Sequence, residues 1–262
     1  MSQLSFDALF SAPETRSFEK VKSTVVMPVD EPKHIPARIY PQSYPAVDHY
    51  RREFVKIFKE TARYHHRYEV FRDFVTVSAI ALENACLKSP KLEEEYFAVI
   101  ARYKTEDLTR FAQLHAQIVM GLEACICDFL GSIFMELELG SDHMGQFFTP
   151  SHISDLLAAL SISERIIELE HIPYITMDEC TCGAGGMVIA AAKYMLEKGY
   201  NPQKQLLVFC TDIDPVAARM CYIQLSLLGI SACVRIGNSL TQVMQRTMHT
   251  PFWYMRFVPS LY

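Results

Sequence analysis

The pattern of hydrophobic positions changes twice along the chain. Within residues 46–139, apolar side chains recur at intervals of three and four residues, as Tyr50, Phe54 and Ile57 illustrate, and this spacing predicts amphipathic helices. From residue 174 onward, short apolar runs alternate with amphipathic segments. That alternation predicts a β-α-β-α-β order and a parallel sheet covered by helices, with ligands at the carboxyl ends of the strands.

Six prolines interrupt the first 45 residues: Pro13, Pro28, Pro32, Pro36, Pro41 and Pro45. Because proline fixes φ and lacks a backbone donor, a long helix or a central strand is excluded there. We therefore predict an extended N-terminal arm over residues 1–45, in which residues 21–29 could form one edge strand. A helical subdomain follows over residues 46–140, with its last helix, residues 107–139, bent near Gly121 and Gly131.

In the second half of the chain, the pattern predicts most strands and helices clearly and leaves residues 241–249 uncertain. Its expected elements are a strand at 174–177, a helix at 187–198, a strand at 205–210, a helix at 216–228 and a strand at 232–236. Ahead of them, Thr149 followed by Pro150 predicts a helix start, with the hydroxyl as N-cap and the proline at the first helical position, and this helix runs to about Leu169. Residues 241–249 are polar and predict a helix or loop.

The first expected strand ends in an acid-then-glycine turn. Glu179 precedes Gly183 and Gly185, and an apolar helix begins at Met187. A strand, a tight turn and a helix in this order bring backbone N–H groups and the positive end of a helix to a ligand.

The next two strand ends also carry polar side chains. Asp212 is placed to bind ribose hydroxyls, although alone it also fits an N-cap for the helix that begins near Pro215. Asn238 offers a donor and an acceptor to an adenine edge, although alone it is also a common turn residue. The joint spacing predicts an adenosine-containing ligand.

The position of Glu179 distinguishes between two such ligands. A carboxylate ahead of the glycines would repel the pyrophosphate of a dinucleotide, whereas it would attract the α-ammonium group of S-adenosylmethionine. The turn also lacks the Gly-x-Gly-x-x-Gly spacing of dinucleotide sites. The sequence therefore favours the methyl donor as the cofactor.

The composition limits the classes of partner and the cellular compartment to be expected. Half of the residues are hydrophobic and the formal net charge is −5, so there is no strong electrostatic footprint for nucleic acid. No apolar run approaches the ~18–20 residues of a membrane span, and no signal peptide is evident. The eight cysteines lie in apolar segments without zinc-knuckle spacing. We expect reduced thiols in a cytoplasmic protein, with no metal site and no membrane association.

Three motifs together resemble those of N6-adenine DNA methyltransferases, and most closely the modification subunits of type I restriction systems. They are Gly-Gln-Phe-Phe-Thr-Pro at 145–150, Glu-Cys-Thr-Cys-Gly-Ala-Gly-Gly-Met at 179–187 and Thr-Asp-Ile-Asp-Pro at 211–215. The resemblance covers about residues 120–240. It implies an α/β fold in which the helical subdomain precedes a shortened, Rossmann-like S-adenosylmethionine-dependent methyltransferase domain over residues 141–262.

The resemblance also implies roles for individual residues. Phe148, Thr149 and Pro150 would line the methionine end of S-adenosylmethionine. Glu179, Gly183 and Gly185 would cradle the cofactor, Asp212 would bind its ribose, and Asn238 would lie near its adenine. The implied partner is DNA, read with the help of another subunit of the specificity type or of a second copy of the chain.

The catalytic motif of that family is not found. The family carries Asn/Asp-Pro-Pro-Tyr/Phe after its fourth strand, which holds the flipped adenine. These 262 residues contain no Asn-Pro-Pro, and Thr250-Pro251-Phe252-Trp253 is the only candidate. It is either a degenerate catalytic loop or a segment whose aromatic residues pack over the sheet edge where the family's later strands would lie. Those strands and the target-recognition region are expected to be missing, because the chain ends at Tyr262.

Two functions remain open at this stage. One is an adenine-N6 DNA methyltransferase of a restriction–modification or mobile-element system. The other is a catalytically inactive relative that binds S-adenosylmethionine and regulates or scaffolds a partner. An RNA or small-molecule methyltransferase is disfavoured by the Phe147-Phe148-Thr149-Pro150 signature. Whether the chain is an enzyme is therefore left undecided by its sequence.

Overall fold

The computed structural model describes residues 44–139 and 148–257. Most of the predicted arm at 1–45, including the possible strand at 21–29, lies outside the described residues. Residues 44 and 45 begin the first helix.

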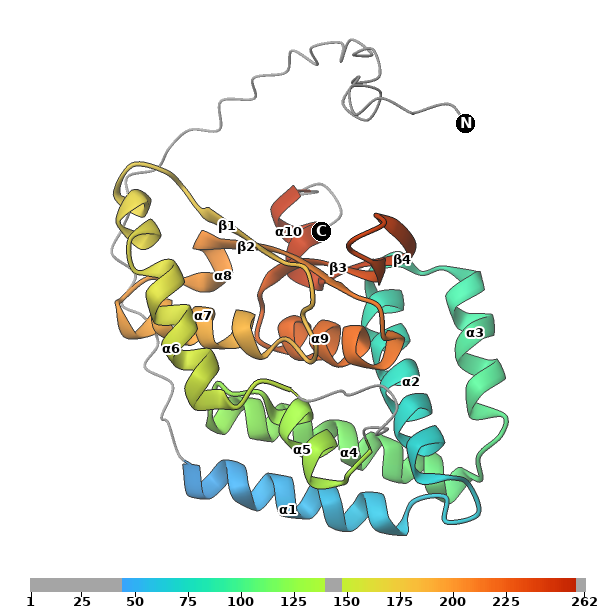
Figure 1. Ribbon diagram of the computed structural model, residues 1–262. Coiled ribbons are helices and arrows are strands. Elements are labelled where there is room, and N and C mark those ends of the chain that lie inside the picture. Colours follow the sequence, from blue (N-terminus) through green and yellow to red (C-terminus); the bar gives the residue numbers. More distant parts are fainter. Residues whose placement is uncertain (1–43, 140–147, 258–262) are drawn as a thin grey trace, which may run out of the picture. The chain divides into compact units, whose positions relative to one another are not determined.

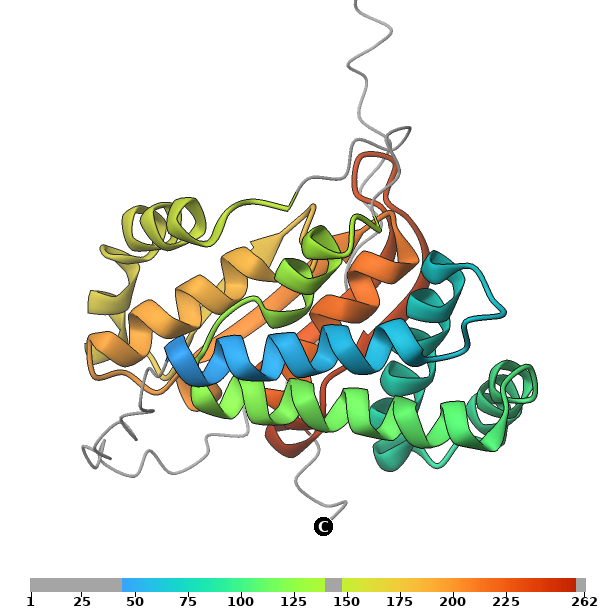
Figure 2. The same cartoon turned by 90° about the horizontal axis from the view of Figure 1, so that it is seen from below.

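The N-terminal half of the described chain is helical, as predicted. Its helices are α1 (Tyr44–Glu60), α2 (Arg67–Leu87), α3 (Pro90–Ile100), α4 (Thr105–Ala124) and α5 (Phe129–Glu136). Helices α1 and α4 lie side by side in both views (Figures 1 and 2). The predicted continuous helix over residues 107–139 is two helices, because Asp128 begins α5 by accepting a hydrogen bond from the backbone N–H of Gly131 at 2.8 Å.

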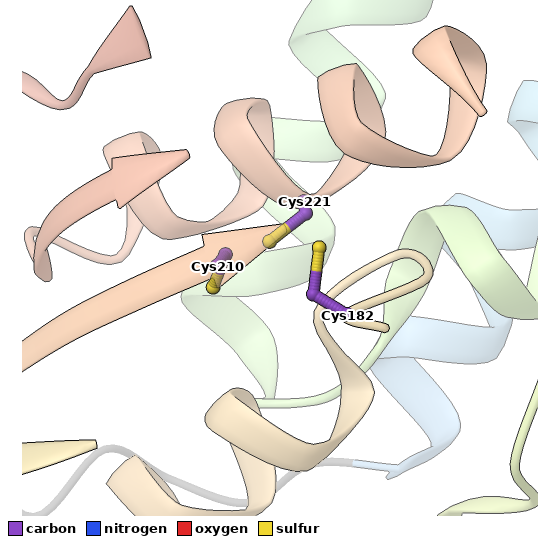
Figure 3. A group of neighbouring side chains, drawn as sticks. All are labelled: Cys182, Cys210 and Cys221. Atoms are coloured by element: carbon purple, nitrogen blue, oxygen red, sulfur yellow. The ribbon is translucent and has the colours of Figure 1, made fainter. Parts of the chain in front are cut away.

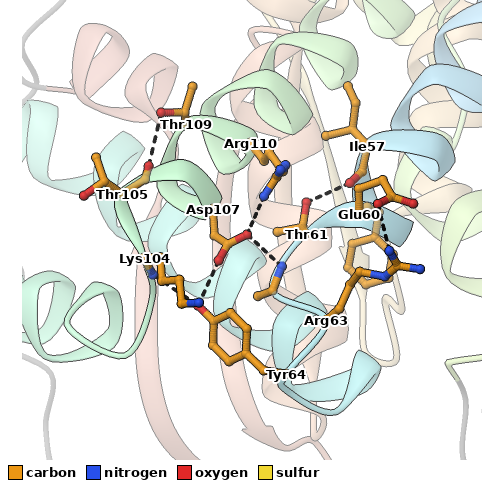
Figure 4. A network of polar contacts seen from close by, with 12 residues as sticks. Ile57, Glu60, Thr61, Arg63, Tyr64, Lys104, Thr105, Asp107, Thr109 and Arg110 are labelled. Atoms are coloured by element: carbon orange, nitrogen blue, oxygen red, sulfur yellow. Dashed lines mark hydrogen bonds and ion pairs between the residues drawn. The ribbon is translucent and has the colours of Figure 1, made fainter.

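A buried carboxylate joins α1 to α4. Asp107, in the first turn of α4, accepts hydrogen bonds from the backbone N–H of Ala62 and from the Tyr64 hydroxyl, each at 2.8 Å. Arg110 completes the network with an ion pair at 2.8 Å (Figure 4). Hydrogen bonds to a charged group are among the stronger ones in proteins, so the network fixes the turn after α1.

Helix α6 (Ser151–Ile162) begins one residue later than predicted. Its N-cap is Pro150, whose carbonyl accepts from the backbone N–H groups of Ile153 and Ser154 at 2.9 and 3.1 Å. Thr149 is exposed and is not the N-cap. The helix also ends before Leu169, and the 3-10 segment η2 (Arg165–Glu170) follows it.

The sheet has the order β1-β2-β3-β4. Its strands are β1 (Ile175–Glu179), β2 (Leu206–Asp212), β3 (Ser231–Asn238) and β4 (Val243–His249), and the helices of this region are α7 (Gly186–Glu197), α8 (Pro202–Gln205), α9 (Pro215–Leu227) and α10 (Pro251–Phe257). The first three strands are parallel. Helices α7 and α9 lie on one face of the sheet and α10 on the other (Figure 1). The predicted α/β fold, with its parallel β-α-β-α-β unit, is confirmed.

Strand β4 corrects the prediction of a helix or loop over residues 241–249. It pairs antiparallel with β3. Its inward positions include Met248, which is buried, and Arg246, which forms ion pairs with Glu83 of α2 at 2.7 Å and Glu95 of α3 at 3.0 Å. Because these partners lie about 150 residues earlier in the chain, the polar sequence of β4 gives no sign that one of its faces is buried.

One hydrophobic core runs through the described residues. Buried side chains of α1, α2, α4 and α5 are continuous with those of α7, α9 and the sheet, with Phe129 and Leu130 of α5 among the fully buried ones. A separate helical subdomain ending at residue 140 stays a prediction. Among the described helices, none combines the length and the apolar character that a membrane span requires.

Candidate functional site

The Gly-rich turn lies between β1 and α7. Gly183 and Gly185 adopt φ values of +53° and +95°, in the left-handed region that favours glycine. The Gly185 N–H donates to the Cys182 carbonyl at 2.8 Å and closes the turn. A Cβ atom on Gly183 would lie 3.0 Å from the ring of Phe148. Both the backbone conformation and the neighbouring ring therefore favour glycine at position 183.

Asp212, at the end of β2, is bonded to this turn. Its Oδ2 accepts from the Gly183 N–H at 2.8 Å, and its Oδ1 accepts from the Asp214 N–H at 2.9 Å. Asp214, not Asp212, is the N-cap of α9, because it accepts from the Val216 N–H at 2.9 Å. The alternative reading of Asp212 as a helix cap is therefore wrong. Since each carboxylate oxygen has two lone pairs, Asp212 retains the capacity to accept from a hydroxyl group of a ligand.

The side-chain amide of Asn238, at the end of β3, can still donate hydrogen bonds to a ligand but can no longer accept them. Its Oδ1 accepts from the N–H groups of Leu240 and Thr241 at 2.9 and 3.2 Å, which occupies both lone pairs. No residue in the described ranges accepts from its NH₂ group. Asn238 can thus donate to an acceptor nitrogen of a base, but it cannot also accept as the sequence suggested.

The ends of β1, β2 and β3 meet at one edge of the sheet. The register pairs Glu179 with Cys210 and Asp212 with Ile236, so Glu179, Asp212 and Asn238 lie at the carboxyl ends of adjacent strands. Burial raises the pKa of both Glu179 and Asp212, and backbone N–H groups partly oppose the shift. Two half-buried carboxyl groups at one edge favour a ligand that brings hydroxyl groups or positive charge.

Asp178, the residue before Glu179 on β1, has its side chain on the other face of the sheet. Successive side chains of a strand point to opposite faces, so Asp178 and Glu179 diverge. The Asp178 side chain is 64% exposed and lies 3.7 Å from Arg235 of β3. Asp178 therefore serves as an internal comparison for Glu179, with the same chemistry one residue away.

Phe148, Thr149 and Pro150 approach the turn from the side of α6. Phe148 lies beside Gly183 and packs edge-on against Phe134 of α5, with ring centroids 5.4 Å apart. All three residues line a cavity of about 590 Å³, together with Gly186 and Lys193 of α7. The structure thus brings this motif next to the Gly-rich turn, as expected.

A buried amide, which the sequence gave no reason to single out, supports the turn from behind. Gln224 of α9 donates from its Nε2 to the carbonyl of Ala184 and to Asp128 Oδ1, both at 2.8 Å. Its Oε1 accepts from the Leu130 N–H at 2.9 Å. The side chain is fully buried, so these bonds connect the turn to the start of α5 without competition from water. A single glutamine in an amphipathic helix carries no pattern that would reveal this role.

Thr250 lies at the other end of the sheet. Because β4 is antiparallel to β3, it starts beside Asn238 and ends with His249 beside Cys233, near the amino end of β3. Thr250 is fully buried, where its hydroxyl donates to the Ile230 carbonyl at 2.7 Å and accepts from the Ala232 N–H at 2.9 Å. The structure does not bring Thr250 to the strand ends that carry Glu179 and Asp212.

The residues after Thr250 begin α10. Pro251 and Phe252 are half-buried, and Trp253 packs edge-on against Phe209 of β2, with ring centroids 5.8 Å apart. These aromatic residues cover a face of the sheet instead of the edge that the sequence suggested.

The sequence profile of the N-6 DNA methylase family matches residues 134–254. No curated protein matches the chain. Among solved structures, it is similar to a protein from Listeria monocytogenes assigned to the class I S-adenosylmethionine-dependent methyltransferases, with 13% identity and a TM-score of 0.43, covering 75% of this chain and 55% of that one. It is also similar to the methyltransferase subunit of a type I restriction–modification system from Streptococcus thermophilus, with 13% identity and a TM-score of 0.37, covering 71% of this chain and 56% of that one.

The chain thus spans little more than half the length of either solved structure. The matched residues 134–254 include the Gly-rich turn, the three parallel strands and Phe148–Pro150. The remaining acceptor capacity of Asp212 is compatible with a ligand that carries hydroxyl groups. Over residues 134–254 the chain is similar to the N-6 DNA methylase family, and this similarity implies S-adenosylmethionine as the cofactor.

Proposed function

We propose that this chain binds S-adenosylmethionine at the carboxyl ends of β1, β2 and β3 and does not transfer the methyl group by itself. The observation that carries the proposal is the bond between Asp212 and the Gly183 N–H, which joins the predicted ribose-binding acid to the predicted cofactor turn. In this role the chain is the cofactor-binding subunit of a system that methylates adenine N6 in DNA, of the restriction–modification or mobile-element type.

Each residue of the site has a defined task in this proposal. Glu179 faces the α-ammonium group, Asp212 accepts from the ribose hydroxyls, and the NH₂ group of Asn238 donates to a ring nitrogen of the adenine. The Gly-rich turn and the N-terminus of α7 offer backbone N–H groups to the methionine carboxylate. Phe148, Thr149 and Pro150 enclose the methionine end. When bound, the cofactor supplies a methyl group activated by its sulfonium centre.

The absence of transfer by the chain alone follows from the position of Thr250. An adenine held for methylation must lie beside the methyl donor, because a misplacement of even 1 Å is costly in catalysis. Thr250 and Trp253 lie near the amino end of β3, and the Thr250 hydroxyl is engaged by two backbone groups. The adenine-binding groups are therefore expected from another subunit, of the specificity type or a second copy of this chain.

The test of cofactor binding uses the two neighbouring acids of β1. Calorimetry with S-adenosylmethionine is expected to show one site in the wild-type chain and at least tenfold weaker binding in Glu179→Gln, because a charge-assisted contact is worth about 1.5–3 kcal/mol. Asp178→Asn, the matched control on the opposite face, should bind as the wild type does. Equal affinity in all three proteins would refute the assignment of Glu179.

A second assay tests whether the chain alone transfers methyl groups. The similarity to the methyltransferase family favours an active enzyme, whereas our proposal is a cofactor-binding chain without transfer. Labelled S-adenosylmethionine is incubated with adenine-containing DNA and the chain alone. We expect cofactor binding without incorporation of label. Incorporation that survives repurification and is lost in Asp212→Ala would establish the chain as a complete methyltransferase and overturn this half of the proposal.

A further inference from the structure

Three cysteines from separate segments meet behind the Gly-rich turn. Cys182 belongs to the turn, Cys210 to β2 and Cys221 to α9. Their sulfur atoms all lie within 4.8 Å of one another (Figure 3). The residues are 5%, 0% and 0% exposed. Cys182 lies within the motif at residues 179–187, but the proposed cofactor contacts use none of the three thiols.

We propose that Cys182, Cys210 and Cys221 form a binding site for a soft, thiophilic metal ion held by three sulfur atoms, with Cu(I) as its representative. Soft thiolate ligands select soft ions, and Cu(I) is the common one among them. Three sulfur atoms within 4.8 Å of one another can hold a three-coordinate ion without further ligands.

The donor set distinguishes this site from a zinc site. Structural zinc is bound almost always by four ligands in tetrahedral geometry, and catalytic zinc adds a water to three protein ligands. In the described ranges, no further His, Cys, Asp or Glu joins the three cysteines. Their burial leaves little access for a water as the fourth ligand. Zinc is therefore expected to bind more weakly than Cu(I).

The three sulfur positions are fixed by the fold. The Cys182 N–H donates to the Thr211 carbonyl at 2.9 Å, which ties the turn to β2. Cys210 lies on a strand that is paired on both sides. A Cβ atom on Gly185 would lie 3.1 Å from the Cys221 sulfur, so the glycine permits the close approach of α9. A site that is already formed avoids much of the cost of ordering its ligands.

Metal binding releases the protons of the cluster. As the Cu–S bonds form, Cys182, Cys210 and Cys221 bind as thiolates and release their thiol protons to solvent. The oxidation state of the ion does not change, so the step requires no oxidant or reductant.

The test is an anaerobic titration of the reduced full-length chain with Cu(I) in the presence of a competing chelator. We expect one tight site, a rise in ultraviolet Cu–thiolate absorption, and a higher melting temperature. Each of Cys182→Ser, Cys210→Ser and Cys221→Ser should weaken this site at least tenfold. The matched control is the double variant Cys125→Ser/Cys127→Ser, which removes another pair of neighbouring thiols and should leave the site intact. Zn(II) in place of Cu(I) should give no tight site.

Two results would overturn the proposal. The first is a tight Cu(I) site that survives in the three cluster variants, or one lost only in the Cys125→Ser/Cys127→Ser control. The second comes from X-ray absorption of the wild-type complex, which does not depend on any variant folding. Three sulfur ligands per copper are expected, and two sulfur ligands would contradict a site built from the whole cluster.

Discussion

Asp212 Oδ2 lies 2.8 Å from the backbone nitrogen of Gly183 and accepts its hydrogen bond, which joins the end of β2 to the turn that follows β1. The bond places the predicted ribose acceptor and the predicted cofactor turn within one hydrogen-bonded unit. A change at either residue therefore alters the position of the other. The predictions below separate effects on this unit from effects on stability alone.

Replacing Gly183 with alanine is expected to abolish cofactor binding. The left-handed backbone costs an L-residue roughly 1–2 kcal/mol, and the added methyl group would lie 3.0 Å from the Phe148 ring. The matched control is Gly199→Ala, where φ is +85° but nothing lies within 4 Å of the added atom. Both variants should lose stability in urea titrations, whereas only Gly183→Ala should lose S-adenosylmethionine binding. Loss of binding in both would assign the effect to destabilisation.

The half-buried Asp128 should make the protein less stable as the pH rises. Burial raises the pKa of Asp128 above its ordinary 3.8, so the folded state holds the proton more tightly than the unfolded state does. The free energy of unfolding contributed by this group is therefore highest below pH 3.8 and falls as the pH rises through the folded pKa. Asp128→Asn keeps an acceptor for Gln224 and removes the charge. We expect the variant to be more stable than the wild type at neutral pH, with the difference vanishing at low pH.

Asp107→Asn is the control for Asp128→Asn, because it should change stability at neutral pH in the opposite direction. Burial alone would raise the pKa of Asp107, but hydrogen bonds from Ala62, Tyr64 and Arg110 together hold it below its usual value. Stability from this group is present above pH 3.8 and is lost as the pH falls through the folded pKa. Asp107→Asn should therefore be destabilised at neutral pH. Denaturant titrations of both variants between pH 3.5 and about 7 measure how each substitution changes the free energy of unfolding. If both substitutions changed it in the same direction at neutral pH, this account would be contradicted.

Thr250→Val tests whether Thr250 is structural. Removing a buried hydroxyl leaves the Ala232 N–H and the Ile230 carbonyl without their partner, which costs about 1–3 kcal/mol. Thr247→Val, on the exposed side of β4, should change stability by no more than about 0.5 kcal/mol. Neither variant should alter cofactor affinity, as calorimetry would show. A Thr250→Val protein of normal stability and impaired methyl transfer would instead support a catalytic loop at this position.

The sequence predicted the parts of the fold that depend on local pattern. Short apolar strands ending in Glu179, Asp212 and Asn238 were identifiable because each is bounded by turn residues. Strand β4 was missed because the partners of Arg246 are Glu83 and Glu95, which are distant in sequence. The assignment of Asp212 required the structure to show that the neighbouring Asp214 is the helix cap.

The sequence predicted the motif residues of the candidate site but not the residues that support them. The motif residues at the strand ends carry a recognisable spacing, whereas Gln224 supports the turn through backbone carbonyl and N–H groups that any sequence possesses. The cluster of Cys182, Cys210 and Cys221 was likewise hidden, since its members come from a turn, a strand and a helix. Cysteine spacing along the chain argued only against a zinc knuckle.

The most direct test of the central claim is calorimetry of S-adenosylmethionine binding to the wild-type chain and to Asp212→Ala, with circular dichroism to establish that both are folded. The account predicts one site in the wild type and at least tenfold weaker binding in the variant, because hydrogen bonds to a charged group are worth about 1.5–3 kcal/mol. No binding by the folded wild type, or equal affinity in the two proteins, would contradict it.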